Sequence, residues 1–309
     1  MKLQIDKPTK AFKTTMFFLS DYIPSYIQFF LTTTSIVALA VTSLLYTYQC
    51  KMIYLAGLPE GSRQVVQKPS EFGMNYTDET LTTKDGVRIK AYICKLPLYA
   101  RDRPTILIFH ANAGNMGHRL FIAKEFYVKL EYNVVMLSYR GYGLSEGTPT
   151  EKGLRIDSQA VLDFVLKDED LKNTKLIAYG QSLGGAVSID LVSRNEDKFS
   201  GMIVENTFLS IPKLIPHVFP LIKYLAFLCH QVWPSEKAIQ QIVNVPILFL
   251  SGLNDELVPP SHMRQLYELS QTRTKHWKGF NNGTHNETVF QPSYYDTIED
   301  FIKKEVLKE

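Results

Sequence analysis

The stretch Gly180-Gln181-Ser182-Leu183-Gly184 decides the fold of this chain. Residues 174–179 before it read as a buried strand, and residues 185–192 after it are typical of a helix. A serine flanked by glycines in a strand-to-helix turn predicts a nucleophile elbow. We expect the turn to be so tight that a Cβ has no room two residues before or after Ser182, which glycine tolerates. The Ser182 hydroxyl is then a candidate nucleophile, and the Leu183 N–H points to where an oxyanion would form.

Two candidate partners for Ser182 follow later in the chain. Asp255 comes after the predicted strand 245–251, at the end of a strand where parallel sheets place their chemistry. His285 lies in a polar turn before a C-terminal helix. A histidine can take the serine proton near neutral pH, and a carboxylate fixes its tautomer. The order serine, aspartate, histidine is that of the α/β-hydrolase fold, with Glu205 as the alternative acid after the strand 202–204.

A second oxyanion donor is expected after the predicted strand 105–110. This strand ends in a turn of small residues that resembles a His-Gly-x-x-Gly region, with Ala111 in place of the glycine. We assign the donor to the backbone N–H of Asn112, with Ala113 as the alternative. We expect His110 to be a structural hydrogen-bonding residue rather than a base.

The pattern of apolar segments predicts an α/β fold. Apolar strands alternate with helical stretches, which favours a mostly parallel sheet with helices on both faces. The predicted parallel strands are 105–110, 133–138, 174–179, 202–206 and 245–251. Residues 80–83 and 88–93 flank an Asp-Gly turn and predict an antiparallel hairpin.

We expect the hydrolase domain to cover residues 76–309 and to carry a cap insertion at 209–244. The cap is strongly apolar between Leu214 and His230. It either completes the core and covers the site or provides an apolar wall for an acyl chain.

The N-terminal region predicts a membrane anchor. Residues 27–48 contain no Asp, Glu, Lys or Arg. About 20 helical residues rising ~1.5 Å each span roughly 30 Å, which is enough to cross a bilayer. A cleaved signal peptide and a buried core helix are the alternatives. We therefore divide the rest of the chain into a cytosolic segment at 1–26, a transmembrane signal anchor at 27–48 and a linker at 49–75.

The charges around the predicted span favour a type II orientation. The span is preceded by four lysines, Lys2, Lys7, Lys10 and Lys13. Positive charge is sparser after it, where Lys51 and Arg63 follow. The positive-inside rule then places the N-terminus in the cytosol and the hydrolase domain in the lumen of the endoplasmic reticulum or another secretory-pathway membrane. Glycosylation sequons begin at Asn75, Asn282 and Asn286, and they are usable only in that orientation.

Composition argues against several other classes of protein. The net charge of +3 is small and the basic residues are dispersed, so no nucleic-acid partner is expected. No Walker motif is present. The histidines and cysteines lack zinc-site spacing, so we expect neither a metal nor a cofactor. Cys50, Cys94 and Cys229 are expected as free thiols, with a Cys94–Cys229 disulfide as the alternative in an oxidising lumen.

Three further segments connect the chain with a known family: 57–63 (Gly-Leu-Pro-Glu-Gly-Ser-Arg), 147–159 and 205–212. Together with the candidate triad, they make the chain resemble the fungal bud-emergence (BEM-type) α/β-hydrolases. It is also similar to the animal alpha/beta hydrolase domain-containing protein 13. The resemblance covers nearly the whole chain and implies a membrane-anchored serine hydrolase, in which Ser182, Asp255 and His285 match the triad positions.

These observations lead to a functional hypothesis. The chain is expected to hydrolyse an ester or thioester through an acyl-enzyme on Ser182. Lipid or S-acyl-protein substrates fit the anchor and the apolar cap, and a small soluble ester is the alternative substrate. The membrane is the expected partner, and no protein partner is indicated. A membrane-tethered scaffold that retains the fold is the alternative from another class, although a scaffold has no need of a complete triad.

Overall fold

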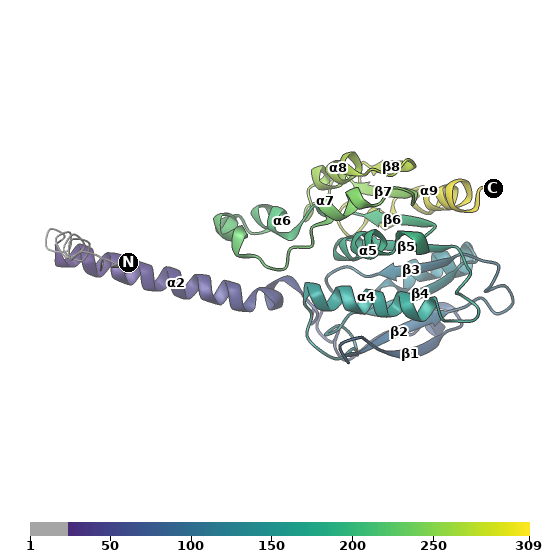
Figure 1. Cartoon of the computed structure of the whole chain (residues 1–309), viewed down its shortest axis with the longest axis horizontal. Helices are drawn as coiled ribbons and strands as arrows, with labels where there is room; N and C mark the ends of the chain where they lie inside the picture. The colour runs from purple at the N-terminus through teal and green to yellow at the C-terminus, as the bar shows by residue number, and fades with distance from the viewer. Residues whose placement is uncertain (1–23) are drawn as a thin grey trace, which may run out of the picture. The chain divides into compact units, whose positions relative to one another are not determined.

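One mixed sheet forms the centre of the domain at residues 49–309 in the computed structural model, which describes residues 24–309 (Figure 1). Across this sheet the eight strands of the described chain run in the order β1-β2-β4-β3-β5-β6-β7-β8. The first two strands are antiparallel, and β3 to β8 are parallel to one another. The strands are β1 (Thr77–Thr82), β2 (Arg88–Cys94), β3 (Thr105–Phe109), β4 (Asn133–Ser138), β5 (Leu176–Gln181), β6 (Gly201–Glu205), β7 (Ile247–Gly252) and β8 (Lys275–Phe280).

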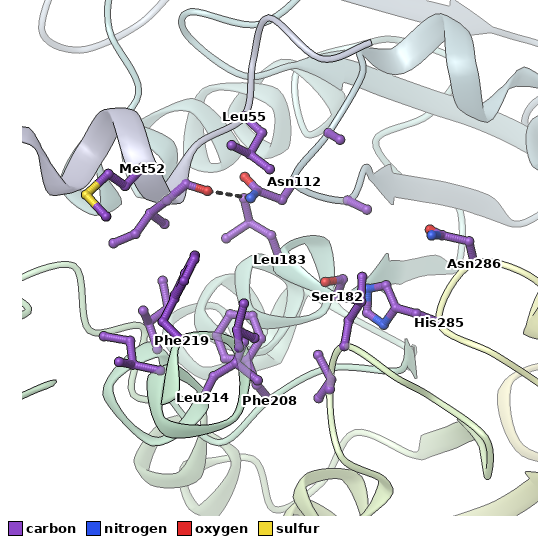
Figure 2. A pocket seen from close by; sticks show the side chains of 18 of the residues that line it. Met52, Leu55, Asn112, Ser182, Leu183, Phe208, Leu214, Phe219, His285 and Asn286 are labelled. Atoms are coloured by element: carbon purple, nitrogen blue, oxygen red, sulfur yellow. Dashed lines mark hydrogen bonds between the residues drawn. The ribbon is translucent and has the colours of Figure 1, made fainter. Parts of the chain in front are cut away.

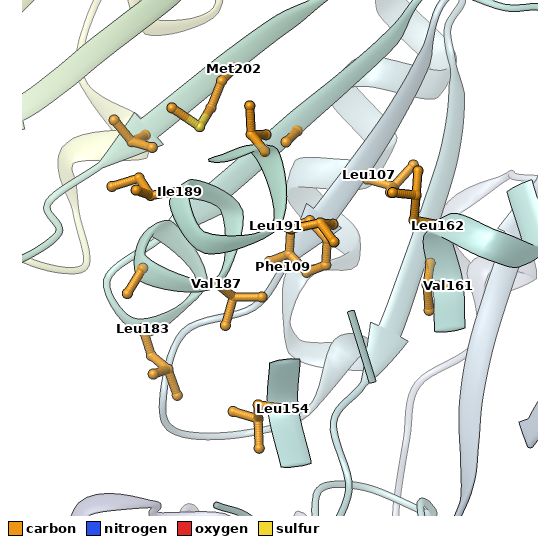
Figure 3. Close-up of a cluster of buried hydrophobic side chains, with 14 of the residues drawn as sticks. Leu107, Phe109, Leu154, Val161, Leu162, Leu183, Val187, Ile189, Leu191 and Met202 are labelled. Carbon is orange, nitrogen blue, oxygen red and sulfur yellow. The ribbon is translucent and has the colours of Figure 1, made fainter. Parts of the chain in front are cut away.

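Helices cover both faces of the sheet, which confirms the predicted fold class (Figure 1). On one face, α4 (Glu151–Val165), α5 (Leu183–Arg194) and α8 (Pro260–Leu269) pack on the sheet. Figure 3 shows part of this core, in which Leu107 and Phe109 of β3, Leu162 of α4 and Leu191 of α5 belong to one cluster. On the other face, α3 (Leu120–Lys124) and α9 (Tyr294–Phe301) cover a second core. Because both faces are covered, β3 to β7 are buried along their whole length.

The predicted hairpin is present and its strands are longer than expected. β1 pairs with β2 from Thr77 opposite Ile93 to Thr82 opposite Arg88. The turn between them uses Gly86 at a φ of 83°, which glycine adopts readily. The predicted strand 174–179 begins and ends two residues later, at Leu176 and Gln181. The strand β8 was not predicted from the sequence.

The segment 209–244 follows β6 and contains four short helices. They are α6 (Ile211–Val218), the 3₁₀ helix η5 (Pro220–Leu228), α7 (Ser235–Ala238) and the 3₁₀ helix η6 (Ile239–Gln241). Trp233, Ile239 and Ile242 are buried and complete the core, whereas η5 has no fully buried residue. The predicted cap is therefore buried at both of its ends and exposed in its middle part.

The predicted span lies inside α2, a 29-residue helix from Ser25 to Ile53 that is long and apolar enough to cross a membrane. The four lysines before it lie outside the described residues. The segment 49–75, predicted as a linker, contributes Tyr54 and Met74 to the core of the domain. Tyr54 Oη donates to Gln231 Oε1 and accepts from Trp233 Nε1, at 3.1 and 3.0 Å.

The remaining helical segments are short and connect these elements. They are η1 (Pro69–Phe72), η2 (Met116–Arg119), η3 (Glu125–Lys129), η4 (Glu196–Lys198), η7 (Thr288–Phe290) and η8 (Ile302–Leu307). The three cysteines are free thiols, so the alternative Cys94–Cys229 disulfide is not formed.

Candidate active site

Ser182 lies in the sharp turn between β5 and α5. Its φ of 54° and ψ of −118° are unusual for a residue with a Cβ, and such strain persists only where the surroundings hold it. Here the Ser182 N–H donates to the Glu205 carbonyl at 2.9 Å, and Thr207 Oγ1 donates to the Ser182 carbonyl at 2.7 Å. The neighbouring strand β6 and the residues after it therefore fix the elbow.

The two glycines of the elbow are required by close backbone contacts. A Cβ on Gly180 would lie 2.1 Å from the Gly184 carbonyl oxygen, and a Cβ on Gly184 would lie 1.9 Å from the Phe109 carbonyl oxygen. Backbone atoms cannot move aside as the end of a flexible side chain can. The expectation that these positions have no room for a Cβ is confirmed.

The side chains of Asp255 and His285 contact each other. His285 Nδ1 lies 2.8 Å from Asp255 Oδ2, and both side chains are almost completely buried. Asp255 Oδ1 accepts from the N–H groups of Leu257 and Val258, at 2.9 and 2.8 Å. Since an ionised carboxylate only accepts, the contact assigns the proton to Nδ1 and leaves Nε2 as the basic nitrogen.

The backbone of His285 is held by the residue that precedes the nucleophile. Gln181 Nε2 donates to the His285 carbonyl at 2.9 Å, and Asn206 Nδ2 donates to the same oxygen at 3.2 Å. The His285 N–H donates to Glu256 Oε2 at 3.1 Å. Segments far apart in the sequence thus place Ser182 and His285 on the same pocket, as Figure 2 shows.

The carboxylate of Glu205, the alternative acid, is bonded by two tyrosine hydroxyls. Its Oε2 accepts from the hydroxyls of Tyr179 and Tyr294, at 2.7 and 2.5 Å. Complete burial raises the pKa of this carboxyl group. The carboxylate that contacts the imidazole of His285 is that of Asp255.

The loop after β3 provides the second candidate oxyanion donor. Asn112 and Leu183 both line the pocket. Their backbone N–H groups make no hydrogen bond to any residue between 24 and 309, so both are available to a ligand. The Asn112 side chain fixes the loop, because its Nδ2 donates to the Ile53 carbonyl and its Oδ1 accepts from Tyr142 Oη at 2.9 Å. Ala113, the alternative, also lines the pocket.

His110 directly precedes this loop and is buried. Its Nδ1 donates to the Ala111 carbonyl at 2.7 Å, and its ring centroid lies 4.2 Å from that of Tyr139. Burial lowers the pKa of His110 to about 3, so the imidazole is neutral at physiological pH. These contacts are those of a structural residue.

The pocket around Ser182 has a volume of about 300 Å³ and is mostly apolar. Figure 2 shows Phe208, Leu214 and Phe219 on one side of Ser182 and Asn286 on the other. The apolar lining residues are Met52, Ile53, Leu55, Ala111, Ala113, Leu183, Phe208, Ile211, Leu214, Ile215, Val218, Phe219, Leu257 and Val258.

Sequence reasoning missed two groups of pocket residues. Met52, Ile53 and Leu55 follow the apolar segment and line the pocket, and Arg119 lines it from the end of η2. Neither group belongs to a motif, and only the tertiary structure brings them to Ser182. No acidic side chain lines the pocket, and no cluster of His, Cys, Asp and Glu within residues 24–309 could hold a metal ion.

Comparisons with solved structures support the fold. The Pyrococcus furiosus esterase Pf2001 superposes with a TM-score of 0.66 at 17% identity, over 78% of this chain and 95% of that chain. An alpha-beta hydrolase from Vibrio vulnificus superposes with a TM-score of 0.67 at 19% identity, over 82% of this chain and 92% of that chain. At these identities the likeness shows the shared fold.

Sequence comparisons establish the family. The family model described as "Serine aminopeptidase, S33" matches residues 100–241. Protein bem46 of Schizosaccharomyces pombe is 44% identical over 86% of this chain and 89% of its own length. A Saccharomyces cerevisiae protein named "Uncharacterized membrane protein YNL320W" is 42% identical, over 86% and 94%. The alpha/beta hydrolase domain-containing protein WAV2 of Arabidopsis thaliana is 38% identical, over 87% and 92%. The chain therefore belongs to the bem46-related family of α/β-hydrolases.

Proposed function

We propose that this α/β-hydrolase is a membrane-anchored serine hydrolase that cleaves an ester or thioester bond in a lipid or an S-acylated substrate. The observation that carries the proposal is the buried 2.8 Å contact between His285 Nδ1 and Asp255 Oδ2, next to Ser182 in an apolar pocket. A hydroxyl, an oriented imidazole and two available N–H groups form the set that acyl transfer requires.

In the proposed mechanism, Ser182 Oγ attacks the carbonyl carbon while its proton passes to His285 Nε2. The N–H groups of Leu183 and Asn112 stabilise the tetrahedral oxyanion. His285 then gives the proton to the departing alcohol or thiol, which leaves an acyl-Ser182 ester. Water attacks this ester, His285 takes a proton from the water and returns it to Ser182, and the carboxylic acid is released. Asp255 keeps the imidazole in the required tautomer and stabilises the imidazolium.

The pocket lining supports an acylated substrate. The side chains of Phe208, Leu214 and Phe219 form an apolar surface that suits a hydrocarbon chain. An aminopeptidase would need a carboxylate to bind the α-ammonium group of its substrate, and the pocket lining has none. The lining therefore favours an acyl ester or thioester over a peptide with a free N-terminus.

Membrane contact is supported by η5, which exposes large apolar side chains. Leu221, Tyr224 and Phe227 are 98%, 81% and 79% exposed. Gln49, the residue directly after the apolar segment, bonds to the Leu228 carbonyl and the His230 N–H, at 3.3 and 2.8 Å. We place η5 at the membrane interface, where aromatic and aliphatic side chains are favoured. In the orientation we propose, the domain faces the lumen of the endoplasmic reticulum or another secretory-pathway membrane.

A substrate series tests this function. The full-length protein in liposomes is given acetyl, hexanoyl and decanoyl derivatives of one leaving group, as ester, thioester and amide. We expect hydrolysis of the esters and thioesters, with a preference for the longer chains, and no hydrolysis by Ser182→Ala. Leu214→Trp should fill the pocket and shift the preference to acetyl, whereas Leu221→Trp, on exposed η5, should not. Preferential hydrolysis of leucine 4-nitroanilide would contradict the proposal and indicate a peptidase.

A further inference from the structure

Arg119 is a cationic residue that lines the pocket of Ser182 and His285. Its Nε is buried and has no hydrogen-bond partner. Within residues 24–309, the Arg119 side chain makes neither a hydrogen bond nor a salt bridge. Arg119 as a whole is half-buried, and partial burial lowers the pKa of its guanidinium group.

Arg140 is a buried arginine whose guanidinium group is paired with carboxylates. The Arg140 guanidinium is held by Asp85 at 2.7 and 2.9 Å and by Asp157 at 2.8 Å. A buried charge is costly unless it is paired in this way. The carboxylate whose charge acts on Arg119 is that of Glu205, which already accepts hydrogen bonds from Tyr179 and Tyr294. Arg119 is thus a cation with five N–H donors and no carboxylate bonded to them.

Arg119 directly precedes a helix that packs against the segment after His285. That helix is α3, where the ring of Phe121 stacks on that of Phe290 at 5.3 Å between centroids. Phe290 ends η7, which follows the His285 loop. Asn286, directly after His285, lines the pocket opposite Phe208, Leu214 and Phe219 (Figure 2). An acyl chain on the apolar surface would leave the polar side to the alcohol or thiol part of the substrate.

We propose that Arg119 binds an anionic group, a phosphate or a carboxylate, on the leaving-group part of the substrate. The inference rests on the proposed hydrolase function and adds a substrate class to it. The planar guanidinium matches both anions, since each offers two oxygens to parallel N–H donors. Binding would supply the partner that the protein itself does not give to Arg119.

The test uses matched neutral and anionic substrates with the same decanoyl group. One pair is S-decanoyl-2-mercaptoethanol and S-decanoyl thioglycolate, and the other is 1-decanoylglycerol and its 3-phosphate. We expect Arg119→Gln to lower kcat/KM for the anionic member about 10- to 100-fold, the effect of losing a charge-assisted hydrogen bond, with little change for the neutral member. Arg119→Lys should retain part of the preference. The anionic substrate whose kcat/KM falls more shows whether Arg119 binds a carboxylate or a phosphate.

Arg264→Gln is the matched control, because the Arg264 guanidinium lies over the ring of Trp277 and does not line the pocket. It should leave both members of each pair unchanged. Equal losses on neutral and anionic substrates in Arg119→Gln, restored in the double variant with Glu205→Gln, would overturn the inference and show that Arg119 only balances Glu205.

A binding measurement separates failure of this inference from failure of the hydrolase function. Ser182→Ala protein is titrated with decyl phosphate and with decanol. We expect decyl phosphate to bind more tightly, and Arg119→Gln in the same background to remove the difference. If no substrate is hydrolysed but this difference is present, the hydrolase proposal fails and Arg119 remains an anion site. Equal binding of the two ligands would overturn the anion site whatever the activity.

Discussion

Asp255 and Glu205 have different surroundings although both are buried carboxylates near His285. Asp255 contacts the imidazole, whereas the Glu205 carboxylate accepts from two tyrosines. We expect Asp255→Asn to keep the geometry but favour the wrong tautomer of His285, lowering kcat by about 10⁴-fold. Glu205→Gln should have a much smaller effect in the same ester assay. The reverse ranking would make Glu205 the acid and contradict the site assignment.

His110 gives the domain a predictable acid sensitivity. The pKa of His110 is about 3 in the folded protein, against an ordinary value near 6.5 when unfolded. Between these values the unfolded state binds one more proton, so stability falls as the pH is lowered from about 6.5 toward 3, by about 1.4 kcal/mol per pH unit.

His110→Gln should remove this contribution. The free energy of unfolding of the variant should then fall by about 1.4 kcal/mol less per pH unit than that of the wild type. The measurement is the free energy of unfolding from urea titrations at pH 7, 6 and 5, on wild type and variant. Equal slopes for wild type and His110→Gln would contradict the buried, neutral state of His110.

At the scale of elements, the β5–α5 elbow makes the sharpest prediction about stability. A Cβ on Gly184 would meet the Phe109 carbonyl of β3 at 1.9 Å, so strand and helix would have to separate. We expect Gly184→Ala to cost on the order of 4 kcal/mol in the free energy of unfolding. Gly57→Ala is the control, since nothing lies within 4 Å of its Cβ. Equal stability of the two variants in urea would contradict the described elbow.

The sequence predicts the parallel strands of the centre but not the edge strand. Strands β3 to β7 are buried on both faces, so each appears as an apolar run. β8 borders the sheet and is mostly half-buried, with lysines at 275 and 278. Its composition follows its exposed position, and the apolar pattern used for the other strands is absent.

The candidate site likewise contains residues that the sequence predicts and residues that it does not. Ser182, Asp255 and His285 are predicted from the sequence, because a local turn and the ends of strands mark them. Arg119 and Met52 reach the pocket only through tertiary packing, for which no local pattern exists. The contact between the Asn112 side chain and the Ile53 carbonyl likewise depends on how residues 49–56 pack against the loop after β3.

At the scale of the whole molecule, the orientation of the domain decides which substrates it can reach. We predict that residues from about Lys51 onward face a lumen, from the four lysines before the apolar segment and the sparser charge after it. In sealed microsomes, added protease should spare the domain until detergent opens the membrane. Digestion without detergent would contradict this orientation and make cytosolic S-acylated proteins the accessible substrates.

The central claim is that Ser182 is a nucleophile activated by His285 and Asp255. Labelling of the full-length protein with a fluorophosphonate probe, read by mass spectrometry of the peptide that contains residue 182, tests it most directly. The account predicts one adduct, on Ser182, and no labelling of a folded Ser182→Ala protein, with ester turnover lowered by about 10⁴- to 10⁶-fold. Wild-type ester turnover by folded Ser182→Ala protein, or an adduct on another residue, would contradict it.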